Sequence, residues 1–395
     1  MSRCFLWFWK GRDMNFLDIG LNKSLVEGLA VESIENPLPI QEVAIPAILE
    51  NKDIYLSAPT GTGKTLAYLL PLFEKMDPEK LALQTIVLAP THELASQIHQ
   101  QALRLSENSK IKIRSLLLIG GANTKRQIEK LKKKPQLVVG SVGRVLELIR
   151  MKKLKIPHVH AVVVDEADRM LAGKSHDDLD RFYRLFSTLP QLIFASATQT
   201  NLILKEIKKW APNLEQISVG ANQVNTNIQH IYFVVEEREK ANLLRKIVRS
   251  INPKRALVFV HRNNAAALVR SKMEHYNISV GDLHGTHGKE SRKKAIDQFR
   301  KGTLQLLIAS DVAARGLDIK GVDCIFNYDV PANSQAYLHR AGRTGRAEEN
   351  GIAISLVTTA EVRLIRRHEK TLKIEMTEAL IQDGVLYSAT PEEDE

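Results

Sequence analysis

Short apolar runs rich in Val, Ile and Leu alternate with longer amphipathic patterns along the whole chain. They form two series: Ile54–Ser57, Thr85–Ala89, Gln136–Val139, Ala161–Val164 and Leu192–Ala195, and then Ala256–Val260, Ile278–Val280, Leu304–Ala309, Cys324–Asn327 and Ile352–Val357. Continuous apolar runs separated by helical patterns are typical of parallel strands that are buried on both faces of a sheet. The pattern predicts two doubly wound α/β domains.

A length of 395 residues is too great for one ordinary core, so two domains are expected. The boundary is predicted at 219–227, a polar segment with Gly and Asn and without periodicity. This assigns 14–218 and 228–374 to the two domains, 1–13 to an N-terminal extension and 375–395 to a C-terminal tail. The acidic end of the chain is typical of a solvated tail.

Composition narrows the class of protein. Hydrophobic residues make up 44% and charged residues 26%, as in globular proteins, and the net charge of +11 favours a polyanionic partner. Cys4 and Cys324 form no Cys-x-x-Cys pair, which speaks against a zinc site and a disulfide framework. No apolar run approaches the ~20 residues that a membrane span needs. We therefore expect a cytoplasmic protein.

A phosphate-binding loop is predicted at Ala58–Thr65, between the strand Ile54–Ser57 and the helical pattern Leu66–Glu74. In this arrangement backbone N–H groups and the helix N-terminus face an anion. The pattern predicts that Lys64 reaches the β- and γ-phosphates and that the Thr65 hydroxyl binds Mg²⁺. The residues predicted to bind the nucleotide here are Thr60, Gly61, Thr62, Gly63, Lys64 and Thr65.

Carboxylates follow the apolar run Ala161–Val164 in the sequence Asp165-Glu166-Ala167-Asp168. At the end of a buried strand, Asp165 is placed to hold Mg²⁺ directly or through water. Glu166 is the candidate that orients or deprotonates the attacking water. A surface acidic turn is the alternative, but a phosphate loop about a hundred residues upstream disfavours it. Together the two segments predict a magnesium-dependent nucleoside triphosphatase.

With these motifs the chain resembles the DEAD-box family of superfamily 2 RNA helicases, over residues 16–371. The resemblance implies two tandem RecA-like domains, ATP as the nucleotide and RNA as the partner. Phe16 and Gln41 match the adenine-reading element of the family, including its spacing of 25 residues. A glutamine amide both donates to and accepts from adenine, so ATP is favoured over GTP.

The family's RNA-gripping segments are similar to Pro90–Ala95, Gly120-Gly121 and Ser141–Arg144 in this chain. Hydroxyls, glycine amides and arginines suit phosphates and 2′-hydroxyls. The RNA-binding residues that the resemblance implies are Pro90, Thr91, Gly121, Ser141, Gly143, Arg144, Arg292 and Ser310. Three residues depart from the family pattern: His92 stands for Arg, Val142 for Pro and Lys289 for Gln.

Further matches concern coupling between the ATP and RNA sites. Ser196-Ala197-Thr198 resembles the coupling motif, whose hydroxyls are expected to bridge towards Asp168. In the second domain, the match to 310–318 implies that Asp318 accepts a hydrogen bond from the ATP ribose. The match to 339–346 implies that His339 takes part in coupling and that Arg343 and Arg346 are arginine fingers.

The resemblance implies RNA-stimulated ATP hydrolysis that drives local, non-processive unwinding of short RNA duplexes or remodelling of ribonucleoproteins. Two alternatives stay open: an ATP-dependent RNA clamp or annealer, which needs the same residues, and a DNA helicase of the same superfamily. Asp168 speaks against the DNA helicase, because the acidic motifs of those proteins commonly end in His. The intact Lys64, Asp165, Glu166 and Arg343 speak against a catalytically dead RNA-binding module.

Overall fold

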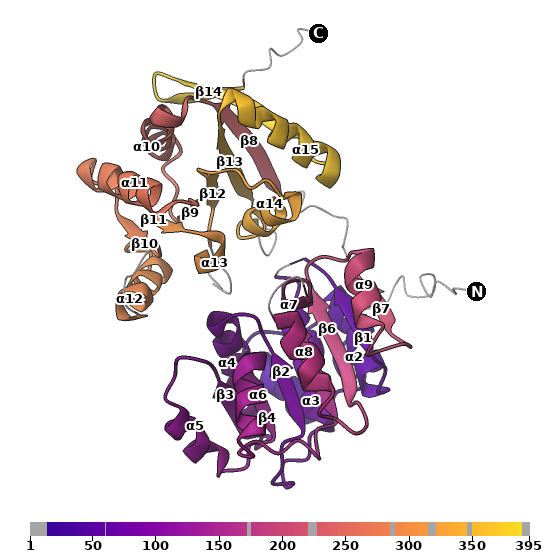
Figure 1. Cartoon of the computed structure of the whole chain (residues 1–395). Coiled ribbons are helices and arrows are strands. Elements are labelled where there is room, and N and C mark those ends of the chain that lie inside the picture. Colours follow the sequence, from indigo (N-terminus) through magenta and orange to yellow (C-terminus); the bar gives the residue numbers. More distant parts are fainter. Residues whose placement is uncertain are drawn as a thin grey trace. The chain divides into compact units, whose positions relative to one another are not determined.

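The computed structural model describes residues 14–59, 61–171, 175–219, 227–284, 289–314, 321–345 and 350–388. The chain divides into two compact units, Met1–Ala221 and Asn222–Glu395 (Figure 1). Most of the predicted linker, 220–226, lies outside the described residues, so its bounds stay a prediction. In the described part of the chain, no helix is long and apolar enough to cross a membrane.

The first unit is built on a parallel sheet with seven strands among the described residues (Figure 1). The strands in chain order are β1 (Ile54–Ser57), β2 (Thr85–Leu88), β3 (Ser115–Leu118), β4 (Leu137–Gly140), β5 (Ala161–Asp165), β6 (Gln191–Ser196) and β7 (Glu215–Ser218). They lie side by side in the order β3-β4-β2-β5-β6-β1-β7. The chain therefore crosses over the sheet between strands, as predicted for a doubly wound domain.

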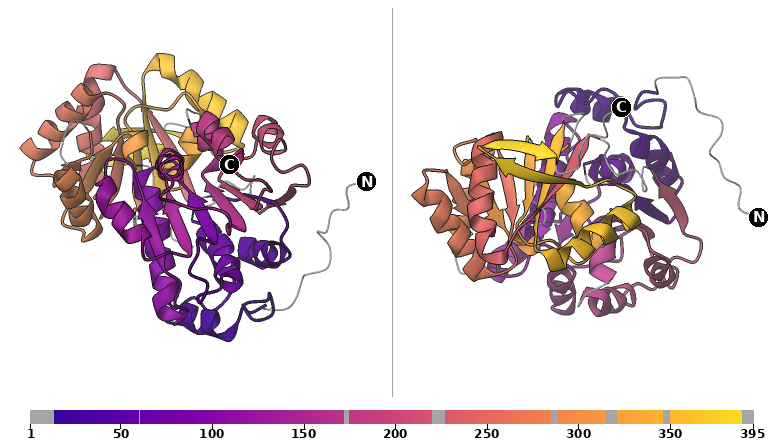
Figure 2. Two further views of the ribbon diagram at one scale, coloured as in Figure 1. Left: turned by 60° about the horizontal axis from the view of Figure 1, so that its bottom comes forward. Right: turned by 90° about the horizontal axis from the view of Figure 1, so that it is seen from above.

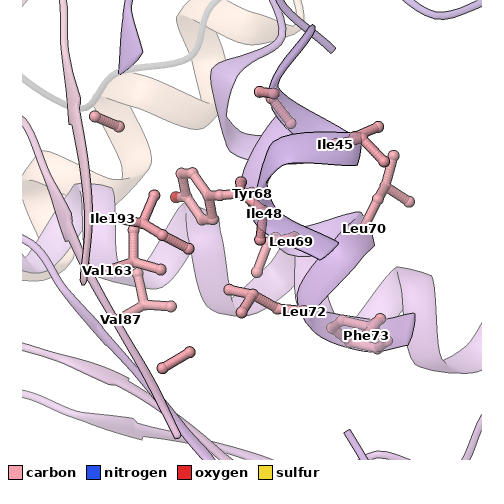
Figure 3. Packing of buried hydrophobic residues seen from close by; sticks show 14 of the residues in the cluster. Ile45, Ile48, Tyr68, Leu69, Leu70, Leu72, Phe73, Val87, Val163 and Ile193 are labelled. Carbon is pink, nitrogen blue, oxygen red and sulfur yellow. The ribbon is translucent and has the colours of Figure 1, made fainter. Parts of the chain in front are cut away.

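Helices cover both faces of this sheet because successive strand residues point to opposite sides. Val163 packs with α2 and α3 in one hydrophobic cluster, whereas Val162 and Val164 belong to a second cluster with α6 and α8 (Figure 3 shows the first). The helices are α1 (Lys23–Ala30), α2 (Pro39–Leu49), α3 (Lys64–Lys75), α4 (His92–Asn108), α5 (Thr124–Leu131), α6 (Val142–Arg150), α7 (Ala167–Leu171), α8 (Ser175–Tyr183) and α9 (Asn201–Ile207).

The second unit repeats this plan on an eight-stranded sheet in the order β10-β11-β9-β12-β13-β8-β14-β15. Its strands are β8 (Ile228–Val234), β9 (Ala256–Phe259), β10 (Val280–Asp282), β11 (Leu306–Ala309), β12 (Cys324–Asn327), β13 (Gly351–Val357), β14 (Thr377–Gln382) and β15 (Val385–Ser388). Its helices are α10 (Lys240–Ile251), α11 (Asn263–His275), α12 (Lys289–Arg300), α13 (Asp311–Ala314), α14 (Ser334–Ala341) and α15 (Val362–Leu372), with short 3₁₀ turns at Glu237–Glu239 and Thr359–Glu361.

The segment predicted to be a C-terminal tail, 375–395, differs from that prediction in its described part. Residues 377–388 form the hairpin β14–β15, whose first strand pairs in parallel with β8 (yellow in Figure 2). The hairpin turns at Asp383 and Gly384, which have φ values of 50° and 79°. An Asp-Gly pair with positive φ at both positions is the turn that tight hairpins favour. The second sheet therefore continues well past the predicted domain end at 374.

Candidate active site

Three strands of the first unit end side by side, and each carries a predicted motif at its carboxyl end. Ser57 at the end of β1 is in register with Ser196 at the end of β6, and Ala195 is in register with Asp165 at the end of β5. The phosphate loop, the acidic residues and the Ser196–Thr198 segment therefore leave the sheet at one edge. Ligands of open α/β sheets bind at such carboxyl ends.

Glycines give the phosphate loop its shape. Gly61 and Gly63 have φ values of 88° and 85°, and Gly63 immediately precedes α3. A Cβ atom at Gly63 would lie 2.5 Å from the Gln41 side-chain nitrogen, so conformation and space both require glycine. The Lys64 ammonium donates to the carbonyl of Pro59 at 2.7 Å, and so does the Thr62 hydroxyl. Thr60, another predicted ligand, lies outside the described residues.

Asp165 and Thr65 meet at the hydroxyl of Tyr68. Tyr68 donates to the Asp165 carboxylate at 2.8 Å, and its hydroxyl also interacts with the Thr65 side chain. Burial and the neighbouring charge of Glu166 raise the pKa of Asp165 to about 6, against the opposing effects of Tyr68 and the Lys64 ammonium. A carboxylate and a hydroxyl beside a phosphate loop are the hard oxygen donors that Mg²⁺ prefers, so these residues fit the ion.

Glu166 is held in an uncommon backbone conformation by its neighbours. Its φ of 48° is in the left-handed region, where residues other than glycine are rare and often functional. Its N–H donates to Asp165 at 2.8 Å, and its carboxylate accepts from Arg169 at 2.6 Å. Sequence reasoning missed Arg169, although the three-residue spacing on a helix was a readable sign of a pair. The ion pair with Arg169 fixes the direction of the Glu166 carboxylate.

The predicted bridge between the coupling segment and Asp168 is present at Thr198. The Thr198 hydroxyl donates to the Asp168 carboxylate at 2.8 Å. The Ser196 hydroxyl does not reach Asp168 but donates to the Thr198 carbonyl at 2.8 Å. The same carbonyl accepts from the hydroxyl of Tyr55, a residue of β1 that sequence reasoning did not single out. These bonds tie the loop after β6 to the acidic segment and to the strand before the phosphate loop.

Phe16 and Gln41, the predicted adenine readers, are both buried. The Gln41 side-chain oxygen accepts from the Leu38 N–H at 2.9 Å, and its nitrogen donates to the Gly63 carbonyl at 3.2 Å. Gln41 thus links α2 directly to the phosphate loop. Phe16 is 0% exposed and belongs to the hydrophobic core that includes residues of α1, α2 and α3. Their role in adenine recognition stays a prediction.

The RNA residues predicted in the first unit lie at the starts of α4 and α6. The Thr91 hydroxyl caps α4 by accepting from Leu94 N–H, and the exposed His92 lies beside Gly120, where an added Cβ would be 3.6 Å from the imidazole. Ser141 and Gly143 begin α6, and Val142 fills the place usual for Pro with a buried side chain. Pro90 lies two residues after the end of β2, and Gly121, in the loop before α5, takes a φ of 68°.

Arg144, which was predicted to contact RNA phosphates, has protein partners in the structure. Its side chain is buried, donating to the Thr124 hydroxyl at 2.7 Å and the Ala122 carbonyl at 3.3 Å, and it pairs with Glu147 at 3.0 Å. The guanidinium is thus used to fasten the loop after Gly120-Gly121 to the start of α6. The fold turns this arginine inward, toward protein partners.

In the second unit, Arg340 is the centre of the described motif between 339 and 346. Its buried guanidinium donates to both oxygens of Asp311 at 2.6 and 2.8 Å, to Asn327 and to the Asp329 carbonyl, and it lies 2.7 Å from the imidazole of His261. Sequence reasoning gave Arg340 no role. The structure makes it the support of the segment that carries Arg343.

The other predicted residues of this unit take the following places. Arg343 lies two residues after the end of α14 at Ala341, and its N–H donates to the Arg340 carbonyl at 3.0 Å; His339 lies within that helix. Arg292 donates to the Ala313 carbonyl at 3.0 Å, while the Ser310 hydroxyl accepts from the Ala313 N–H at 3.2 Å. Arg292 and Ser310 thus meet at α13. Asp318 and Arg346 lie outside the described residues.

Comparisons with known proteins agree with this arrangement. Residues 38–206 match the DEAD/DEAH box helicase family and residues 239–348 match the helicase conserved C-terminal domain. The chain is 37% identical over 364 residues to the probable ATP-dependent RNA helicase YfmL of Bacillus subtilis, covering 91% of this chain and 95% of the relative. It is 38% identical over 352 residues to the DEAD-box ATP-dependent RNA helicase CshC of Bacillus cereus, covering 89% and 90%.

Solved structures give the same answer. Dbp5 of S. cerevisiae bound to RNA and ADP BeF3 superposes with a TM-score of 0.82 at 31% identity, covering 92% of this chain and 95% of Dbp5. Mss116p bound to ssRNA and AMP-PNP, at 21% identity, shares the fold with a TM-score of 0.82. These likenesses confirm the prediction of two RecA-like α/β domains. The chain belongs to the DEAD-box family of ATP-dependent RNA helicases.

Proposed function

We propose that this chain uses RNA-stimulated ATP hydrolysis to separate short RNA duplexes locally or to remodel ribonucleoproteins. The observation that carries the proposal is the hydrogen bond from Thr198 to Asp168. It joins the acidic segment at the nucleotide site to the loop after β6. A conformational change in one of these segments can therefore move the other. Dbp5 of S. cerevisiae, 31% identical to this chain, was solved bound to RNA and ADP BeF3, which supports the same partners here.

At the nucleotide site, Lys64 would hold the β- and γ-phosphates together with the backbone N–H groups of residues 61–65, where α3 begins. Asp165 and Thr65 would hold Mg²⁺, which neutralises phosphate charge when it is bound. Glu166, aimed by Arg169, would orient the attacking water and take its proton. Gln41 and Phe16 would recognise adenine, for which the Gln41 amide must exchange its present bonds. Asp318 would receive the ribose.

RNA would be gripped through its backbone by Pro90, Thr91, Gly121, Ser141 and Gly143, with Arg292 and Ser310 in the second unit. Such contacts supply affinity without reading bases, so binding should weaken steeply with salt. We reassign Arg144 from an RNA contact to the residue that fixes the position of 120–124, because its guanidinium is already committed to protein partners.

The arginine fingers Arg343 and Arg346 belong to the other unit from Lys64. We propose that ATP and RNA together draw the two units closed, so that these arginines reach the γ-phosphate only in that state. Arginine fingers are worth ~10³–10⁵ in rate. Thermodynamic reciprocity then requires that RNA tighten ATP binding and that ATP tighten RNA binding by the same factor.

Steady-state ATP hydrolysis, with and without single-stranded RNA and with DNA of the same sequence, tests this proposal. We expect stimulation by RNA and not by DNA. Glu166→Gln should retain ATP and RNA binding, but its rate of ATP turnover should fall by a factor of ~10²–10⁴. The matched control is Glu107→Gln, at an exposed position of α4. Equal hydrolysis under all three conditions would contradict coupling, and full activity of the Glu166 variant would remove that residue from the mechanism.

A displacement assay on a short RNA duplex decides between unwinding and an ATP-dependent clamp or annealer. Both need RNA-stimulated hydrolysis, but only a helicase releases the partner strand when ATP is added. Retention of the duplex at full ATP turnover would favour the clamp.

We also propose that 219–227 links two domains at 14–218 and from 228 onward, and that the protein works in the cytoplasm, where RNA and ATP are available. Limited proteolysis that yields two stable fragments cut within 219–227 is the expected result for the linker. Cell fractionation tests the location.

A further inference from the structure

Positive charge is concentrated in one short part of the first unit. Residues 110–134 contain nine Lys or Arg residues and a single acid, Glu129, so this segment of 25 residues carries a net charge of +8. The whole chain carries +11. A general surplus of surface lysines would be spread along the sequence, so this concentration needs its own explanation.

The fold gathers these side chains at one edge of the sheet. Strand β3 ends the strand order, and Arg114 directly precedes it. The N–H groups of Gln136 and Leu137 both donate to the Arg114 carbonyl, at 2.9 and 3.2 Å, so the segments 110–114 and 132–136 lie side by side. We call this surface the basic edge and define it as the exposed residues Lys112, Arg114, Lys130, Lys132, Lys133 and Lys134.

The charges of the basic edge are not neutralised locally. Within the described residues, one ion pair is formed there, between Lys132 and Glu129 at 2.8 Å. Its two members are 69% and 66% exposed, and exposed pairs of this kind contribute little energy. The cationic groups therefore lie close together in water and repel one another. Binding of a polyanion would relieve this repulsion.

The basic edge is continuous with the predicted RNA residues through α5. Asn123 caps the start of α5, two residues after Gly121, and the Thr124 hydroxyl accepts from Arg144. Exposed Lys125 and Arg126 occupy the first turn, and the basic edge follows at the other end. A helix of eight residues is ~12 Å long, which corresponds to roughly three to four phosphates of a nucleic acid strand.

We propose that the basic edge is a second RNA-binding site, which holds the phosphate backbone of RNA that extends beyond the predicted motifs. The proposal rests on the proposed function, because it extends the path of an RNA that is held at those motifs. Its ligand is the RNA backbone without regard to sequence, since lysines act as point charges on phosphates. Figure 1 shows α5 beside β3, at the side of the unit away from β7.

A membrane surface or an acidic protein fits less well. Among the described residues, none of the exposed large hydrophobic side chains falls within 110–134. Interfacial membrane binding uses an apolar face, and protein interfaces are anchored by buried aromatic or apolar side chains. Phosphate contacts need neither, so the composition of the surface favours RNA.

The test compares the intact chain with the triple variant Lys132→Gln, Lys133→Gln, Lys134→Gln. The matched control is Lys205→Gln, Lys208→Gln, Lys209→Gln, which removes three exposed charges on and after α9, next to the opposite end of the sheet. Fluorescence anisotropy gives the dissociation constant for a short RNA that fills only the predicted motifs and for a longer RNA, between about 50 and 200 mM salt.

We expect the triple variant to bind the longer RNA about tenfold or more weakly and to lose ~2 from the slope of log affinity against log salt, because each single-stranded phosphate contact contributes ~0.7. Binding of the short RNA, and the ATP hydrolysis that it stimulates, should be unchanged, as should all properties of the control. Equal weakening with both RNAs, or no difference between the two triple variants, would overturn the second site. If the intact chain neither binds RNA nor is stimulated by it, the proposed function itself fails.

Discussion

Replacing Arg340 by Ala should destabilise the second unit by about 3–5 kcal/mol, the usual cost of removing one partner from a buried ion pair. Arg340 is 2% exposed, and its guanidinium also lies over the Phe259 ring, 4.8 Å from the centroid. The substitution leaves the buried Asn327 oxygen and the Asp329 carbonyl without their donor, at about 1–3 kcal/mol each. Those losses alone reach the lower end of the expected range.

Asp311 adds an electrostatic part to this cost. Burial opposes its ionisation, but hydrogen bonds from His261 and Arg340 outweigh burial and hold the pKa of this carboxyl well below its usual range. A depressed carboxyl pKa means that the associated stability is present at neutral pH and is lost as the pH falls through the acid range. The deficit of Arg340→Ala should therefore be largest near pH 7 and should shrink in acid. Arg340→Lys keeps the positive charge but not the planar guanidinium, so its stability should lie between those of the intact chain and Arg340→Ala.

Hydrogen exchange followed by mass spectrometry is the suitable assay, read on peptides of 228–388. The three tryptophans, Trp7, Trp9 and Trp210, all belong to the first unit, so intrinsic fluorescence would not report on the second. The double variant Arg340→Met, Asp311→Asn should cost less than the sum of its single changes, because it removes both charges. A loss below ~1 kcal/mol for Arg340→Ala, or strict additivity of the pair, would refute the reasoning.

Three further changes test separate features. Gly63→Ala should lower ATP affinity at least tenfold, because φ is 85° and the new Cβ would meet Gln41 at 2.5 Å; unchanged binding in a titration would contradict the loop geometry. Thr198→Val removes a bond of ~1–3 kcal/mol to Asp168 and should reduce RNA stimulation of hydrolysis while sparing ATP affinity; undiminished stimulation would exclude the bridge from coupling. Burial lowers the pKa of His230 to about 4, whereas the unfolded chain titrates near 6.5, so stability should fall by roughly 3 kcal/mol from pH 6.5 to 4. Urea unfolding followed by circular dichroism gives the free energy of unfolding at each pH. His230→Gln should reduce the pH dependence of this free energy by the equivalent of one proton. The same pH dependence in the variant and the intact chain would contradict the assignment.

The sequence predicts most of the strands that are buried along their whole length and misses several that are only partly buried, among them the interior strand β8. β1 and β5 are apolar on both faces, so each appears as an unbroken run of hydrophobic residues. β7, at one edge of the first sheet, exposes Gln216 and Ser218, which dilutes the signal, whereas β3 at the other edge was missed although Leu116–Leu118 are apolar. The β14–β15 hairpin had a local sign in Asp383-Gly384, but its place beside β8 depends on residues more than a hundred positions away.

The site follows the same division. The phosphate loop and the acidic segment were readable because each is one strand followed by a turn. Tyr68 and Asp165 are 97 residues apart, and Tyr55 and Thr198 are 143 apart, so only the packing of the sheet brings these pairs together. The resemblance of 141–144 to a family motif implied an RNA contact for Arg144. Tertiary structure decides whether an arginine faces a ligand or protein partners, and the local sequence does not reveal which of the two it is.

The short pairing between β8 and β14 has a consequence for handling the protein. Within the described residues β14 pairs with β8 only at Thr377 and Glu378. These two residues cover the edge of β8 that faces away from β13, although β8 is seven residues long. A chain shortened at 374, or at 348 where the family match ends, would leave β8 with unpaired backbone groups and apolar neighbours. Exposed edges of this kind recruit other chains and aggregate. Versions trimmed to the motif-bearing part of the second unit should therefore precipitate, while those that keep residues to 388 should stay dispersed.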